Sequence, residues 1–412
     1  MNKKVCRTLV GMVMALALFP LAASGADQVI KLGTIFSRTG PIANLGMESW
    51  RGAEMARLLQ NEKGGVLGKK IVFVDTDAPD AKAAVAETER LCTVEKVPVI
   101  LGSFSSSICF AASAKSEQYK VVYWELGASA KKITERGLKY LFRTCQHGDG
   151  GGEQQLQFAA EVLASRMGKN RNTIRIASVY EDSGYGDAWA VGIREMAKKM
   201  GVKLVLDESY NHKATDLSSL VMRIKAAEPD VILESSYEND GILLFRQIRE
   251  LGLKIKMFVG SGGGMNLPGY RQGAGDDVDN HVCNVGFPGY NLNPSYAKGI
   301  EKLADLYRKT FKQEPEGVFS LVNYMGAMAL WDVIKRAGSL DSEALVKAAR
   351  ETNIPGDDTI LRYGIKFAPP GAPNMGQNIL ARFFVTQWQD GKLYIVWPDE
   401  AATPGRKLVV VK

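Results

Sequence analysis

Short apolar runs alternate with longer segments of helical period along most of the chain. In the first third, the strand-like runs are Val29–Phe36, Ile71–Asp75, Val97–Leu101, Val121–Trp124 and Tyr140–Arg143. Two amphipathic stretches lie between the early runs, Leu45–Asn61 and Ala81–Val94. An alternation of this kind predicts parallel strands joined by crossover helices.

The same rhythm restarts further along the chain and then changes near residue 290. The restart contains the strand-like runs Ile174–Tyr180, Lys203–Leu206, Val231–Leu233 and Ile255–Val259, and the helical stretches Asp187–Met200, Leu217–Ala227 and Ile242–Leu251. Three helices and three strands are expected after it, at Pro294–Phe311, Phe319–Ala337, Ser342–Arg350, Leu361–Phe367, Leu380–Gln387 and Leu393–Val396. No flexible linker separates the two α/β units, so we expect two lobes that face each other across a cleft. Ligands bind such folds at the carboxyl ends of the strands.

The first 26 residues are typical of a secretory signal peptide. Lys3, Lys4 and Arg7 precede an uncharged, apolar run from Thr8 to Ala26 that ends in small residues. Cleavage is therefore expected near Ala26. Removing the three positive charges from the net +7 leaves +4, and without basic clusters this charge gives no reason to expect a nucleic-acid partner. We expect an exported, soluble protein.

Four cysteines follow the leader, Cys92, Cys109, Cys145 and Cys283. An oxidising compartment permits disulfides, and Cys92 with Cys109 is the pair closest in sequence. Buried free thiols are the alternative, and the sequence does not decide between the two.

Motifs of catalysis and of metal binding are absent from the sequence. His147, His212 and His281 lie far apart and have no metal-ligand spacing, and neither a Cys-x-x-Cys nor a His-Glu-x-x-His pattern occurs. The glycine clusters 148–152 and 260–264 fail the spacing of phosphate and dinucleotide loops, so tight turns between a strand and a helix are the interpretation. We expect neither an enzyme, nor a cofactor, nor a metal site.

Four segments that follow predicted strands carry the chemistry of a ligand site. Segment 102–107 is rich in serine, which suits a carboxylate or phosphate at a helix start, and 124–129 offers small residues and a hydroxyl. Segment 182–186 presents a tyrosine between glycines, and 236–241 presents a tyrosine with acids. Helix caps and ordinary turns are the alternative for each segment, including acids that only favour a helix N-terminus.

These segments, in this order, resemble the periplasmic binding proteins of the leucine/isoleucine/valine type, which deliver solutes to ABC importers. The likeness extends through nearly all of the mature chain. Its motifs are Thr39–Gly46, Arg51–Glu54, Asn61–Gly65, Gly102–Ser107, Gly127–Ser129, Thr134–Gly137, Phe142–Thr144 and Tyr185–Gly186.

The resemblance implies roles for individual residues. Serine hydroxyls and main-chain N–H groups would hold a ligand carboxylate, at Ser106, Ala128 and Ser129, with Ser105 and Gly127 in the same two loops. Tyr185 and Tyr237 would close over the ligand from the second lobe, and Leu45 stands where the family often has a larger aromatic wall.

One departure from the family bears on the ligand. Gly262 stands where leucine-type relatives carry the glutamate that binds the ligand ammonium, and a buried ammonium without a counter-charge is costly. Either Asp240 or Glu238 supplies the charge from the neighbouring loop, or the ligand has no ammonium. Pro79 and Ser105 stand where some relatives have an early cysteine pair.

The resemblance implies a type I periplasmic binding protein fold, with two Rossmann-like lobes joined by several chain crossings. We expect residues 27–143 and 284–360 in the first lobe, and residues 144–283 and 361–412 in the second. The expected function is capture of a branched-chain or aliphatic amino acid for an inner-membrane permease. The alternatives are the same role for an aromatic or short-chain organic acid, and an extracytoplasmic amide or amino-acid sensor.

Overall fold

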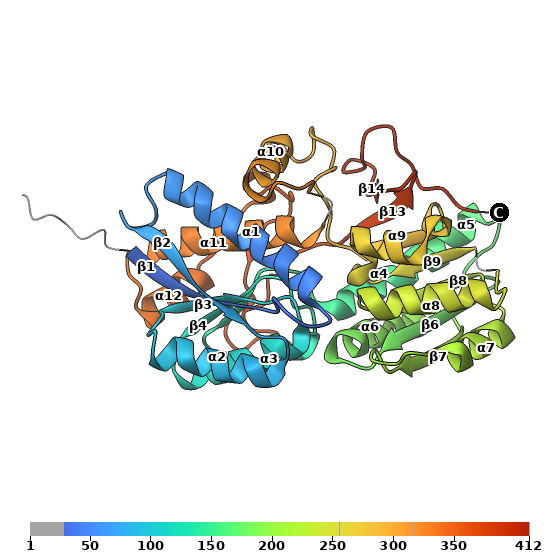
Figure 1. The fold of residues 1–412 in the computed structure, drawn as a ribbon, viewed down its shortest axis with the longest axis horizontal. Helices are drawn as coiled ribbons and strands as arrows, with labels where there is room; N and C mark the ends of the chain where they lie inside the picture. The colour runs from blue at the N-terminus through green and yellow to red at the C-terminus, as the bar shows by residue number, and fades with distance from the viewer. Residues whose placement is uncertain (1–28, 255, 316, 412) are drawn as a thin grey trace, which may run out of the picture.

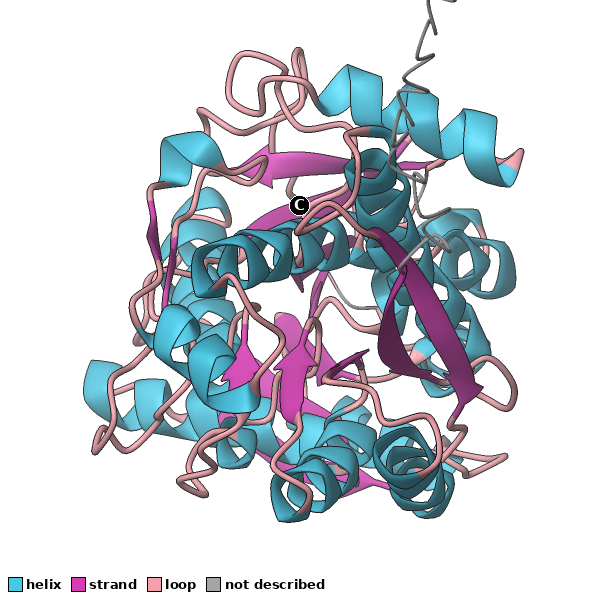
Figure 2. Ribbon diagram, turned by 90° about the vertical axis from the view of Figure 1, so that its left-hand side faces the viewer, coloured by secondary structure: helices cyan, strands magenta, loops and turns pink. Residues whose placement is uncertain are grey.

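The structure, a computed structural model, describes residues 29–254, 256–315 and 317–411. Two lobes lie side by side, each a sheet with helices on both faces (Figures 1 and 2). The predicted α/β class with two Rossmann-like lobes is confirmed. The expected signal peptide, Cys6 and Ile255 lie outside the described residues. No helix of the described ranges is both long enough and apolar enough to cross a bilayer.

The first lobe is a parallel sheet of five strands in the order β2-β1-β3-β4-β5. Its strands are β1 (Val29–Phe36), β2 (Lys70–Asp77), β3 (Val99–Gly102), β4 (Val122–Glu125) and β5 (Leu141–Arg143). Helices α1 (Ala43–Glu62), α11 (Phe319–Ala337) and α12 (Ser342–Arg350) cover one face, and α2 (Ala81–Thr93) and α3 (Ser106–Gln118) cover the other (Figure 1). Alternate residues of β1 enter the two cores, so burial of both faces accounts for its nearly continuous apolar run.

The second lobe is a mixed sheet of seven strands in the order β14-β13-β10-β9-β8-β6-β7. The parallel strands are β6 (Ile176–Glu181), β7 (Leu204–Tyr210), β8 (Val231–Ser235), β9 (Met257–Gly260) and β10 (Val282–Gly286). Strands β13 (Phe384–Gln389) and β14 (Lys392–Trp397) join the β10 edge in antiparallel pairing. The helices are α4 (Gly148–Gln157), α5 (Ala164–Arg166), α6 (Gly184–Met200), α7 (Ser218–Ala227), α8 (Glu238–Glu250) and α9 (Pro268–Ala274).

The glycines of segment 148–152 form the first turns of α4, so the interpretation as a tight turn is wrong. They are small because α4 crosses α6 very closely. A Cβ on Gly151 would lie 2.4 Å from the Trp189 ring, and a Cβ on Gly152 would lie 2.0 Å from the Trp189 carbonyl oxygen. The glycines therefore allow α4 to pack closely against α6, and this packing outweighs the poor helix propensity of glycine.

Several other boundaries differ from the predicted ones. Helix α10 (Ile300–Phe311) begins six residues late, after Gly299 at a left-handed φ of 91°. Strand β10 was not predicted, and the expected run at 361–367 is reduced to β12 (Ile365–Lys366), which pairs with β11 (Asn353–Ile354). Helices α6 and α8 start earlier than expected, so parts of the two tyrosine-bearing segments are helical first turns.

The chain passes between the lobes three times, after β5, after β10 and before β13. The division of the lobes at 283/284 and 360/361 stays a prediction. Pairing of β10 within the second sheet favours a crossing after Gly286. The Phe367 ring lies 5.3 Å from the Trp124 ring and 5.1 Å from the Phe142 ring, which favours a later return, near Phe383.

All four cysteines of the described part are free thiols, so the favoured Cys92–Cys109 disulfide is wrong and the alternative holds. Cys109, Cys145 and Cys283 are fully buried. Burial raises the pKa of the half-buried Cys92 thiol to about 11. These thiols therefore act as small apolar side chains.

Candidate functional site

The carboxyl ends of strands from both sheets meet at a small cavity between the lobes. The cavity is about 20 Å³ in volume, which is room for about one water molecule. Aromatic rings make up half of its wall, and small residues make up most of the rest. The lining consists of Leu45, Phe104, Gly127, Ser129, Tyr185, Trp189, Tyr237, Ser261, Gly262, Gly263, Gly286, Phe287, Phe319 and Phe383.

Six of the ten residues expected at the ligand site line this cavity: Leu45, Gly127, Ser129, Tyr185, Tyr237 and Gly262. The other four, Ser105, Ser106, Ala128 and Asp240, are buried nearby without forming its wall. Sequence reasoning missed most of the aromatic wall. Trp189 lies in the first half of α6, Phe319 starts α11, and Phe287 and Phe383 follow or precede strands of the second sheet. Among the aromatic wall residues other than the two tyrosines, only Phe104 lies in a segment that the sequence analysis had singled out.

Ser129 offers a free hydroxyl at the cavity. Its side chain is buried and its Oγ has no hydrogen-bond partner within the described residues. A buried hydroxyl without a partner costs about 1–3 kcal/mol. In contrast, the Ser106 Oγ accepts a hydrogen bond from the Ala130 N–H at 3.1 Å. Of the serines expected to hold a carboxylate, Ser129 is the one that faces the cavity with its hydroxyl available.

The buried Glu125 carboxylate occupies the main-chain donors of the two carboxylate loops. It accepts hydrogen bonds from the N–H groups of Ser103 at 2.6 Å, Gly127 at 2.8 Å and Ala128 at 2.6 Å. The expected role of the Ala128 N–H toward a ligand is therefore not met in this arrangement. Glu125 lies at the end of β4 and ties the ends of β3 and β4 together beneath the cavity.

Two tyrosines form the wall contributed by the second lobe. Their ring centroids are 5.5 Å apart, and the Tyr185 hydroxyl donates to the Ser261 carbonyl at 3.0 Å. The Tyr237 hydroxyl lies 3.3 Å from the Ser183 Oγ, and Ser183 caps α6 by accepting from the Tyr185 N–H. Burial raises the pKa of both phenols well above its ordinary value. Both phenols at the cavity wall are therefore neutral at pH 7.

Neither acid proposed as a counter-charge reaches the cavity. The Asp240 carboxylate accepts from the Tyr210 hydroxyl at 2.8 Å and from the Tyr237 N–H at 3.4 Å, closing a capping box at the start of α8. Burial raises its pKa to about 7. Glu238 accepts from the Asn44 side-chain amide of the first lobe at 2.9 Å, and burial raises its pKa. Both carboxyl groups therefore already have hydrogen-bond partners within the protein.

Gly262 is required by its backbone. Its φ of 71° is left-handed, and a Cβ there would lie 2.6 Å from the Gly286 Cα on the neighbouring strand end. Gly262 and Gly286 both line the cavity. A glutamate at 262, as in the leucine-type pattern, would therefore require the loop to adopt another path.

A row of buried polar side chains lies behind this glycine loop. Strand pairing aligns Glu234, Gly260 and Asn284 across β8, β9 and β10 on one face of the sheet. Both carboxyl oxygens of Glu234 and both amide atoms of Asn284 are buried without a hydrogen-bond partner among the described residues. Burial raises the pKa of Glu234 to about 8, so the group is mainly neutral at pH 7.

Hydrogen bonds and an ion pair join the lobes around the cavity. Besides the Asn44–Glu238 bond, the Asn239 amide donates to the Pro41 carbonyl at 3.4 Å. Lys131 of the first lobe lies 3.5 Å from the Asp149 carboxylate of α4. With a cavity this small, a ligand of ordinary size can enter only when these contacts open. The arrangement is a closed one.

The chain is similar to known proteins in both its sequence and its fold. The family model described as a periplasmic binding protein matches residues 29–392. A Leu/Ile/Val-binding protein homolog 7 from Brucella abortus (strain 2308) is 37% identical over 389 residues, covering 94% of this chain and 96% of that protein. The isoleucine complex of the branched-chain amino acid transporter substrate-binding protein LivJ from Streptococcus pneumoniae superposes with a TM-score of 0.76 at 23% identity, covering 93% of this chain and all of that one. An ABC-transporter solute-binding protein from R. palustris in complex with 4-hydroxybenzoate gives 0.75 at 18% identity, covering 93% and 97%.

Proposed function

This chain belongs to the periplasmic binding protein family, and we propose that it is the solute-binding component of an ABC importer. In this role it is exported, its signal peptide is removed near Ala26, and it works in the periplasm. It carries its ligand to an inner-membrane permease without chemical change. The match to the family over residues 29–392 supports the transport role.

We propose that the ligand is an aromatic or short-chain organic acid that has no ammonium group. The observation that carries this proposal is the composition of the cavity wall. Seven aromatic rings and no carboxylate line it, and all of its lining residues belong to the described part of the chain. A buried ammonium needs an anionic or carbonyl partner, whereas an apolar ring needs only surface to cover it.

The Ser129 hydroxyl would receive the ligand carboxylate, because its Oγ is buried at the cavity without a partner. The Tyr185 and Tyr237 rings would cover the apolar part of the ligand from the second lobe. Both lobes contact the ligand only when closed, so binding shifts the population toward the closed form. The residues Leu45, Gly127 and Gly262 would shape the rest of the wall.

Capture of a branched-chain amino acid is the second candidate. The names of the Brucella relatives, at 37% identity across nearly the whole chain, favour it. In that case Asp240 or Glu238 would have to leave its present partners and turn toward the ligand.

Thermal unfolding with matched ligand pairs separates the two candidates. The mature protein is refolded to remove carried ligand and heated with isoleucine or 3-methylpentanoate, and with phenylalanine or 3-phenylpropanoate, alongside benzoate and 4-hydroxybenzoate. A ligand at a hundredfold its dissociation constant stabilises by about 2.7 kcal/mol. We expect a rise in Tm with acids that lack the amino group. A rise with the amino acids alone would overturn the ligand class, and no rise with any compound would count against both candidates.

A further inference from the structure

Three side chains that can bind a metal converge on the second lobe, outside the ligand cavity. Glu181 is the last residue of β6, Asp182 follows it, and His212 lies two residues after β7. The strands are neighbours, and Glu181 pairs with Tyr210 in the ladder. The histidine is 30 residues from the acids, so a search for motifs with short spacing does not find this set.

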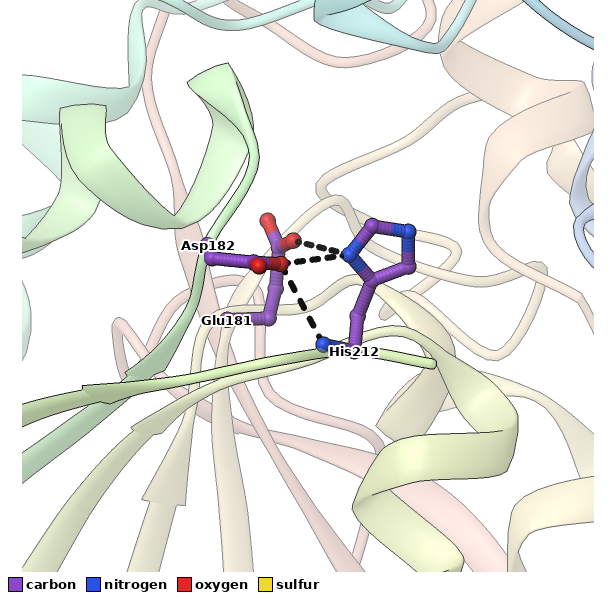
Figure 3. Close-up of side chains that lie close together, drawn as sticks. All are labelled: Glu181, Asp182 and His212. Carbon is purple, nitrogen blue, oxygen red and sulfur yellow. Dashed lines mark hydrogen bonds and ion pairs between the residues drawn. The ribbon is translucent and has the colours of Figure 1, made fainter. Parts of the chain in front are cut away.

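One ring nitrogen of His212 faces both carboxylates, and the other points away from them (Figure 3). The Nδ1 atom lies 2.6 Å from the Asp182 Oδ1 and 3.6 Å from the Glu181 Oε2. In a tetrahedral zinc site with bonds of about 2.0–2.1 Å, ligand atoms lie roughly 3.4 Å apart. Widening the His212–Asp182 pair would bring both carboxylate contacts of Nδ1 close to that separation, and the three ligand atoms all lie within 4.8 Å of one another.

The surrounding hydrogen bonds hold Glu181 in place before any metal binds. Its Oε1 accepts from the Ser183 hydroxyl at 2.6 Å and from the Gly186 N–H at 2.7 Å, while its Oε2 accepts from the Ser183 N–H at 2.8 Å. The side chain is fully buried, and the free side of Oε2 is turned toward His212. Such support around a ligand lowers the cost of organising a metal site.

The main chain also holds Asp182, because its Oδ1 accepts the His212 N–H at 3.2 Å. The side chains of Asp182 and His212 remain 43% and 30% exposed, which leaves a solvent-facing position for a further ligand. The site therefore offers a buried, fixed carboxylate and a partly open rim.

We propose that Glu181, Asp182 and His212 bind a divalent transition-metal ion of the zinc class. One imidazole nitrogen and two carboxylate oxygens suit Zn²⁺, whereas Mg²⁺ and Ca²⁺ prefer oxygen ligands throughout. The imidazole binds in its neutral form, with its proton on Nε2 and the Nδ1 lone pair toward the ion. The His212 ring lies 6.1 Å from the Tyr237 ring, so the ion would sit behind a wall of the ligand cavity.

Calorimetric titration of the chelator-treated mature protein with ZnCl₂ tests the site without any organic ligand. We expect one zinc ion per chain, with affinity at least tenfold weaker in His212→Ala and weaker in Asp182→Asn. His281→Ala is the matched control, because His281 lies on the same lobe with Nδ1 3.1 Å from the Lys256 carbonyl, away from the cluster. It should bind zinc as the wild type does.

Equal zinc affinity in the wild type and His212→Ala, or no zinc binding by the wild type, would overturn the proposal and leave a simple His212–Asp182 hydrogen bond. Thermal unfolding of each variant without metal verifies that it folds. If His212→Ala does not fold, the zinc affinity of Asp182→Asn, a change at an exposed side chain, still tests the site. Replacing ZnCl₂ by MgCl₂ should give no comparable binding. The proposed solute transport does not enter this experiment, so the two proposals fail separately.

Discussion

Replacing Glu234 by glutamine should stabilise the protein at neutral pH. The Glu234 carboxyl is fully buried at the end of β8, and neither oxygen has a hydrogen-bond partner among the described residues. Burial raises its pKa to about 8, from 4.5 for a free glutamate; the nearby Ser236 hydroxyl opposes this shift, and the Asp240 charge adds to it. The folded protein therefore keeps a proton that the unfolded chain releases. Stability is lost as the pH rises from about 4.5 to about 8, the window between the two pKa values.

The size of the effect follows from this window. Each pH unit costs about 1.4 kcal/mol, so at pH 7 the loss amounts to about 3 kcal/mol relative to pH 4.5. Glutamine has nearly the same shape and no titrating proton, so Glu234→Gln removes the loss. At roughly 2 °C per kcal/mol, Tm at pH 7 should rise by about 6 °C, while at pH 4.5 the two proteins should differ little.

Thermal unfolding of the wild type and Glu234→Gln between pH 4.5 and 8 measures this difference. Glu250→Gln, at an exposed position on α8, is the matched control and should follow the wild type at every pH. If the variant kept the pH dependence of the wild type, Glu234 would not be the source of the stability loss. A loss of stability at all pH values would mean that Glu234 has a donor that the amide cannot replace.

Gly262→Ala should lower stability by about 1–3 kcal/mol, measured by denaturant unfolding, because it combines a left-handed φ with a 2.6 Å approach to the Gly286 Cα; an unchanged midpoint would contradict this. Ser129→Ala should leave Tm of the free protein unchanged or raised and weaken binding of the active acid at least tenfold by calorimetry, and equal affinity would remove Ser129 from the site. In native protein near neutral pH, a maleimide should label Cys92 slowly, because burial raises the pKa of its thiol to about 11, and the other three described thiols, which are fully buried, still more slowly; mass spectrometry of a digest showing faster labelling of a buried thiol would contradict this.

The overall architecture could be predicted from the sequence, because parallel strands buried on both faces appear as continuous apolar runs. Helices Phe319–Ala337 and Ser342–Arg350 were predicted with the bounds that the structure has. The helical role of the α4 glycines could not be predicted, because they are small to allow contact with Trp189, a partner about 40 residues away. Strand β10 was missed for a related reason, because its identity depends on pairing with β9 and β13.

The candidate site was predictable where it lies in segments directly after strands. Ser129, Tyr185 and Tyr237 were found in this way, and all three line the cavity. Phe287, Phe319 and Phe383 were not found, because they look like ordinary core aromatics until the two lobes are brought together.

Hydrogen-bond partners were the least predictable part of the site. From spacing alone, Asp240 is a free acid near the cleft, yet the fold commits it to Tyr210 and to the start of α8. Glu125 likewise appears as a strand-end residue, while in the structure its carboxylate accepts three main-chain N–H groups. Such roles depend on which strand ends become neighbours.

Small-angle X-ray scattering measures whether the two lobes close around a bound solute. The refolded protein is measured free and then saturated with whichever acid raises Tm most. The loaded protein should scatter as the closed arrangement of Figure 1 does, and the free protein should have a larger radius of gyration. Identical curves for the free and loaded protein would mean that the ligand binds without drawing the two lobes together, contrary to the expected closure.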